Sequence, residues 1–138
     1  MNLLLDTHIA LWYASNDARL PPKARRLICE EAYSVHYSIV SVWEVALKHS
    51  ISKERMPVSD DEFLEYVEGL QFVFLPIEKQ HVSALKTLCL APGAKEHRDP
   101  FDRMLLCQAK TEGLVFLTHD ALSCPATRSK TIFRPRLT

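Results

Sequence analysis

"NLLLDTHIALWYAS", residues 2–15, decides the fold class, because its apolar pattern changes abruptly within a few positions. The continuous apolar run at its start is typical of a short strand that is buried on both faces. Asp6 ends that run, and the residues after it place apolar side chains at helical spacing. The stretch therefore predicts a buried strand, then an acid, then a helix.

The rest of the chain repeats this alternation of short apolar strands and amphipathic helices. Further strands are predicted at residues 34–38, 71–76, 114–118 and 131–133, and helices at residues 7–15, 21–33, 38–50, 58–70, 78–90 and 100–113. Apolar strands joined by helices predict a parallel sheet that is covered on both faces. We therefore expect one α/β domain over residues 1–138, with three α/β/α layers around a central parallel sheet.

Composition and charge exclude several classes of protein. The 138 residues are 47% hydrophobic and 25% charged, as in a soluble globular protein, and they contain no membrane-spanning apolar run. The first residues lack the basic region of a signal peptide, and the four cysteines form no CxxC pair, so we expect a cytoplasmic protein with reduced thiols and no zinc site. A net charge of zero argues against non-specific coating of nucleic acid, and the three isolated glycines form no dinucleotide-binding loop or P-loop.

Acidic residues follow two of the predicted strands and begin one of the predicted helices. Asp6 directly follows the first strand, Asp120 lies two residues past strand 114–118, and Asp102 lies in the first turn of helix 100–113. In a parallel sheet, the carboxyl ends of the strands and the N-termini of the helices that run back share one edge, where ligands bind. We therefore predict that these three acids converge there.

Two further acids each have two interpretations. Asp99 precedes Pro100 and is predicted to cap the helix that follows, with assistance at the acidic site as the alternative. Glu44 lies among the apolar residues of helix 38–50. It either joins the other acids or is exposed on a narrow polar stripe with Ser41 and Lys48.

Carboxylates that are brought together repel one another unless they share protons, pair with bases or bind a cation. Hard oxygen ligands suit Mg²⁺ or Mn²⁺, and such an ion activates water and stabilises charge in phosphodiester hydrolysis. Hydroxyls near the same edge are expected to support the acids or a metal-bound water, and histidines there are candidate bases, with hydrogen-bonded surface histidines as the alternative. These residues are Thr7, Ser41 and Thr118, and His8, His97 and His119.

Four stretches carry a family resemblance: "LLLDTHIALWY" (3–13), "SVWEVALK" (41–48), "HRDPFDRMLLCQA" (97–109) and "VFLTHD" (115–120). In the same order and spacing, they resemble the PIN-domain family, and more closely the VapC-type toxin ribonucleases of bacterial toxin–antitoxin pairs with the HRDPFDR motif. The resemblance implies a PIN-like fold, a carboxylate-bound Mg²⁺ or Mn²⁺, RNA as substrate, an antitoxin as partner and a homodimer. The acids that it places in the catalytic site are Asp6, Glu44, Asp99, Asp102 and Asp120, and all of these except Asp99 are implied metal ligands.

Other functions fit the residues less well. An aspartyl-phosphate phosphatase needs a second acid two residues after the first, but His8 stands there, and a receiver domain needs an early acidic pair. A PIN-like binding or scaffold module without catalysis remains the alternative. RNA would need nearby cations, and the candidates are Arg98, Arg103, Arg128, Lys130, Arg134 and Arg136. Trp12 and Tyr13 are candidates for a surface that a second subunit or an antitoxin covers.

Overall fold

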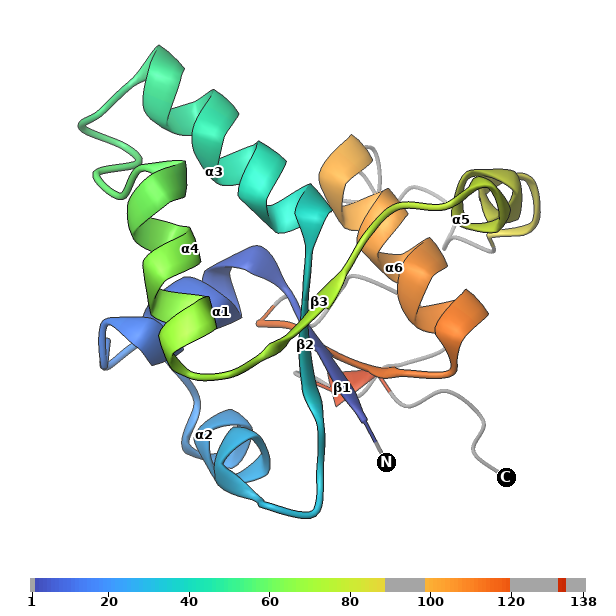
Figure 1. Cartoon of the computed structure of the whole chain (residues 1–138), viewed down its shortest axis with the longest axis horizontal. Helices are drawn as coiled ribbons and strands as arrows, with labels where there is room; N and C mark the ends of the chain where they lie inside the picture. Colours follow the sequence, from blue (N-terminus) through green and yellow to red (C-terminus); the bar gives the residue numbers. More distant parts are fainter. Residues whose placement is uncertain (1, 89–98, 120–131, 134–138) are drawn as a thin grey trace.

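The computed structural model describes residues 2–88, 99–119 and 132–133 (Figure 1). Its strands are β1 (Leu3–Leu5), β2 (Val35–Ser38), β3 (Val73–Leu75), β4 (Val115–Leu117) and β5 (Ile132–Phe133). Its helices are α1 (Thr7–Ala14), α2 (Pro22–Cys29), α3 (Ile39–Ile51), α4 (Asp60–Gly69), α5 (Lys79–Ser83), the 3-10 turn η1 (Ala84–Thr87) and α6 (Pro100–Glu112). Nowhere in these ranges is a helix long and apolar enough to cross a membrane.

The described strands form one sheet in the order β3-β2-β1-β4-β5. β1 pairs in parallel with β2 on one side and with β4 on the other, β2 pairs in parallel with β3, and β5 runs antiparallel to β4. The predicted parallel sheet is therefore confirmed for four strands, and β5 adds an antiparallel edge. Because β2 and β3 lie on one side of β1 and β4 on the other, the strand order reverses between β1 and β4. Ligands of such sheets bind at this switch point.

Helices cover both faces of the sheet, which confirms the predicted three-layer α/β/α arrangement. Along β1, Leu3 and Leu5 belong to one core and Leu4 to the other, as expected when successive side chains of a strand point to opposite faces. All three leucines are fully buried. Figure 1 shows α1, α2 and α4 on one side of the sheet, and α5 and α6 on the other.

Two predicted helices are shorter in the structure. α2 ends at Cys29 and not at residue 33, because Glu30 has an extended backbone (φ −73°, ψ 117°). The helix predicted at 78–90 is the short α5 followed by η1. Of these two segments only His81 is buried, so there is little packing to support a longer helix. At the end of α6, Gly113 has φ 69°, the left-handed conformation in which glycine commonly ends a helix.

Candidate active site

The candidate site lies at the carboxyl ends of β1 and β4, where the strand order reverses. Asp6 follows β1 and Thr118 follows β4. The Asp6 backbone N–H donates to the Leu117 carbonyl (2.9 Å), so the two strand ends are fastened side by side. The prediction that Asp6 lies at the carboxyl edge of the sheet is therefore confirmed.

The carboxylate of Asp6 is held from several directions and is only 3% exposed. As the N-cap of α1, its Oδ1 accepts from the Thr7 backbone N–H (2.7 Å), where the positive end of the helix dipole favours a negative charge. Its Oδ2 accepts from the Thr118 hydroxyl (2.7 Å) and lies 3.5 Å from His119 Nδ1. These contacts fix the orientation of the acid.

Glu44 is 2% exposed and not on a solvated stripe, so the structure supports the interpretation that it joins the other acids. Its Oε1 lies 2.7 Å from the Thr7 hydroxyl, which is itself 2.8 Å from the Ser41 hydroxyl. A hydroxyl has one hydrogen, so Thr7 donates to Glu44 and accepts from Ser41. Thr7 therefore bridges two acids: its backbone N–H holds Asp6 and its side chain holds Glu44.

Lys48 is a residue of the site, although the sequence pattern indicated it only as part of an exposed polar stripe. Its Nζ donates to Glu44 Oε2 (2.5 Å) across one turn of α3. Burial by itself lowers the pKa of Lys48, but the hydrogen bond and charge of Glu44, with the charges of Asp99 and Asp102, raise it above its ordinary value. In the sequence, the spacing of four residues between Glu44 and Lys48 already indicated that the two side chains could pair on a helix.

Asp99 and Asp102 begin α6 beside this site. Asp99 is the N-cap, and its Oδ1 accepts from the Phe101 backbone N–H (2.8 Å), which confirms the predicted capping role. Asp102 lies in the first turn and is partly buried. Phe101 packs edge-on against Trp43 of α3, with ring centroids 4.8 Å apart, and this contact joins α6 to the helix that carries Glu44.

An aromatic cluster borders the acids. The ring centroid of His119 lies 5.0 Å from that of Trp12 and 5.2 Å from that of His8, and Arg19 lies over Trp12. Burial lowers the pKa of His8, an effect that the charge of Asp6 partly opposes. Two of the three predicted histidines therefore lie near the acids.

Some predicted residues lie outside the described ranges. They are Asp120, His97, Arg98 and the basic residues Arg128, Lys130, Arg134 and Arg136. Among the cations predicted to bind RNA, Arg103 lies within the described ranges. Its Nε is buried without a hydrogen-bond partner among the described residues.

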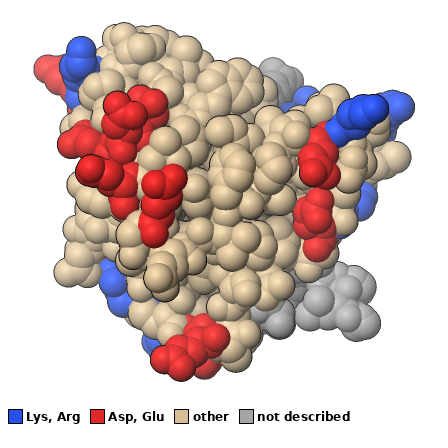
Figure 2. Space-filling model, viewed as in Figure 1, with Lys and Arg blue, Asp and Glu red and all other residues tan. Residues whose placement is uncertain are grey.

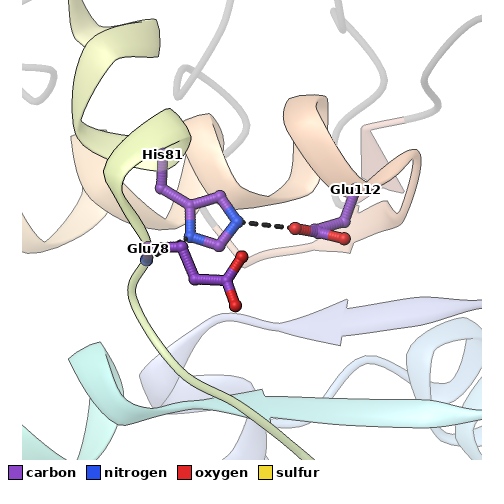
Figure 3. Close-up of side chains that lie close together, drawn as sticks. All are labelled: Glu78, His81 and Glu112. Atoms are coloured by element: carbon purple, nitrogen blue, oxygen red, sulfur yellow. Dashed lines mark hydrogen bonds and ion pairs between the residues drawn. The ribbon is translucent and has the colours of Figure 1, made fainter.

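A second group of possible metal ligands, at the junction of α5 and α6, consists of Glu78, His81 and Glu112 (Figure 3). His81 is fully buried, its Nδ1 accepts from the Glu78 backbone N–H (2.9 Å), and its Nε2 lies 2.7 Å from Glu112 Oε2. With Nδ1 as acceptor, the ring proton of neutral His81 is on Nε2 and donates to Glu112. A metal on Nε2 would move that proton to Nδ1, against a backbone donor. This geometry favours a link between two helices over a metal site.

The donor set at the strand ends fits a hard divalent cation. Asp6 and Glu44 are buried carboxylates from separate elements, Asp102 begins a third, and hydroxyls of Thr7 and Thr118 orient the first two. Carboxylate oxygens with few nitrogen or sulfur donors are typical of Mg²⁺ and Mn²⁺ sites. The Glu78, His81 and Glu112 group lacks that composition.

Comparison with known proteins agrees with this architecture. Residues 3–122 match the PIN domain family, so the chain belongs to that family. No curated protein sequence matches significantly.

Solved structures share the fold, among them the following three. DNA-bound VapBC from Salmonella typhimurium is 19% identical, with a TM-score of 0.59 over 99% of this chain and 97% of that chain. VapBC2 from Rickettsia felis, bound to a promoter DNA fragment, is 12% identical, with a TM-score of 0.59 over 88% and 89%. A toxin–antitoxin complex from Klebsiella pneumoniae is 17% identical, with a TM-score of 0.54 over 86% and 87%.

Proposed function

We propose that the protein is a Mg²⁺- or Mn²⁺-dependent endoribonuclease that hydrolyses RNA phosphodiester bonds, and that it is the VapC-type toxin of a bacterial toxin–antitoxin pair. One observation carries the nuclease proposal: Asp6 and Glu44, both almost fully buried, are joined through Thr7 at the switch point of a PIN-domain sheet. Burying two carboxylates is costly, and a bound divalent cation offsets that cost.

In this proposal Asp6, Glu44 and Asp102 hold the metal, and Asp120, outside the described ranges, is proposed as a fourth ligand. The ion would supply a nucleophilic water and stabilise charge on the phosphate. Asp99 sets the direction of the first turn of α6 and thereby positions Asp102. Thr7 and Thr118 hold the carboxylates in orientations that suit a ligand.

Two observations support the proposed antitoxin partner: the likeness of this chain to solved structures and its partly exposed apolar side chains. The three structural neighbours described above are toxin–antitoxin complexes, which supports an antitoxin partner for this chain. Half-buried Trp12 and Tyr13 are the proposed contact for that antitoxin.

A homodimer is proposed over the edge strand β3, where Val73 is 44% and Phe74 46% exposed. Figure 2 shows an area without charged side chains there, between the acidic side chains over α4 and those at α5. Light scattering should give twice the chain mass for the purified protein and the monomer mass for Phe74→Asp. A monomer for both proteins across micromolar concentrations would refute the dimer.

Cleavage and metal binding on one preparation test the enzymatic proposal. The wild type should cleave RNA with Mn²⁺ and not with EDTA, and Asp6→Asn and Glu44→Gln should lose both cleavage and Mn²⁺ binding by calorimetry. Glu112→Gln is the matched control, because it removes one carboxylate from the other cluster, and it should retain both. Cleavage by purified Asp6→Asn at the wild-type rate would refute the site, whereas RNA binding without cleavage by the wild type would support a binding module.

A further inference from the structure

A pocket of about 620 Å³ opens beside the candidate active site, between the start of α1 and the end of α3. Its lining includes His8, Lys48, Ile51, Glu54, Arg55 and Met56. Two of these side chains also belong to the acidic site. Lys48 is hydrogen-bonded to Glu44, and the charges of Asp6 and Glu44 act on His8. The pocket therefore adjoins the acids, with Lys48 at the boundary.

The pocket combines a cation with apolar and aromatic surface. Arg55 is exposed, and its guanidinium has no hydrogen bond or ion pair within the described part of the chain, while its backbone N–H is bonded to Ser52. Ile51 at the end of α3 is 75% exposed, a large apolar side chain left in water. The charged residues in this lining are one acid, Glu54, and two cations, Lys48 and Arg55.

His8 gives the pocket a fixed aromatic wall. Its ring is packed edge-on against His119 (5.2 Å between centroids) and tilted against Trp12 (5.9 Å). A ring that is already held by neighbours loses little conformational freedom when a second ring stacks on it. Nucleobases stack readily on aromatic side chains without regard to sequence.

We propose that this pocket is a subsite for the RNA nucleotide next to the cut, with its phosphate on Arg55 and its base against His8 and Ile51. The volume lies within the range of small-molecule sites and accommodates a single nucleotide. A cluster of carboxylates repels RNA phosphates, so the chain needs a cation beside it, and Arg55 presents a planar fork that matches phosphate oxygens. The identity of the ligand as part of an RNA rests on the proposed function.

Mononucleotide binding tests the subsite without any cleavage. Uridine and adenosine 5′-monophosphate, titrated into metal-free wild type in EDTA, should shift NMR signals of the Ile51 methyl groups, the His8 ring and Arg55 Nε. Ribose 5-phosphate and inorganic phosphate should bind more weakly, because they lack the base. Arg55→Gln should weaken nucleotide binding by about fivefold or more, as expected for loss of a charge-assisted contact. Lys53→Gln, the same charge change in the same loop, should stay within about twofold.

The same variants separate the subsite from the proposed function. With Mn²⁺ and RNA, Arg55→Gln should raise KM and leave kcat unchanged, whereas Lys53→Gln should change neither. Shifts confined to other residues, equal binding of inorganic phosphate, or equal effects of Arg55→Gln and Lys53→Gln would each overturn the subsite. Nucleotide binding here by a protein that does not cleave RNA would remove the proposed nuclease and leave the pocket as a nucleotide site.

Discussion

Replacement of Lys48 by methionine tests how the buried charge of Glu44 is stabilised. The substitution keeps most of the aliphatic stem and removes the ammonium that donates to Glu44 Oε2. Glu44 is 2% exposed, so its carboxylate would keep the Thr7 hydroxyl and lose its cation. A hydrogen bond to a charged group contributes about 1.5–3 kcal/mol.

A value near or slightly below the lower end of that range applies here, because the Lys48 side chain is 40% exposed and solvent screens the pair. We therefore expect Lys48→Met to lower the free energy of unfolding by about 1–2 kcal/mol, which corresponds to a fall in Tm of about 3–8 °C for a chain of this size. Urea unfolding followed by circular dichroism in EDTA measures the first quantity. Saturating Mn²⁺ should reduce the loss, because the proposed ion neutralises the same carboxylate.

A double-mutant cycle isolates the pair. In the Glu44→Gln background, Lys48→Met should cost less than about 0.5 kcal/mol, which leaves a coupling energy of about 0.5–2 kcal/mol. Lys53→Met is the matched control, since Lys53 is exposed, and it should change stability by less than about 0.5 kcal/mol. Equal costs of Lys48→Met with and without the Glu44 carboxylate would show that the ion pair contributes nothing to stability, against this prediction.

Three other expected results, at Asp99, Gly113 and His8, come from the geometry. Asp99→Ser keeps an N-cap and should retain most RNA cleavage, whereas Asp99→Ala should cost about 1 kcal/mol in urea unfolding; severe loss of cleavage in both, with unchanged unfolding, would make Asp99 a ligand instead. Gly113→Ala forces φ 69° on a residue with a Cβ and should cost about 1–2 kcal/mol, which thermal unfolding will detect. His8 should titrate by NMR below its ordinary pKa of 6.5, and lower still in Asp6→Asn, which removes a charge that raises it. The pKa of His8 is lower in the folded protein than in the unfolded chain. The free energy of unfolding should therefore fall as the pH drops below the unfolded-state pKa of His8. A measured pKa above 6.5 for His8 would contradict the argument that burial lowers it.

The order of strands and helices was predictable because each depends on local periodicity. Leu3, Leu4 and Leu5 form a run that is typical of a strand covered on both faces, and the structure buries all three. The position of Asp6 at the sheet edge follows from that strand and from parallel pairing alone. The antiparallel direction of β5 was not predictable, since a strand of two residues carries too little pattern to fix its direction.

The contacts inside the candidate site depend on side-chain geometry that periodicity does not determine. On α3, the same helical spacing fits Glu44 in the interior or Glu44 in solvent, and only packing against α1 decides between them. Thr7 and Thr118 were expected to support the acids, and the structure confirms hydrogen bonds from both. The pairing of Lys48 with Glu44 was missed, because a lysine one turn from a glutamate is also common on exposed helix faces.

The position of a bound Mn²⁺ ion would show whether the acids at the strand ends hold a metal. Crystals of the wild type soaked in Mn²⁺ would locate the ion by its anomalous scattering. We predict a peak about 2.1 Å from a carboxylate oxygen of Asp6, beside Glu44 and Asp102, and no such peak in Asp6→Asn crystals. A peak between Glu78, His81 and Glu112 with none at Asp6 would contradict it, because the metal would then lie where the His81 hydrogen bonds argue against one.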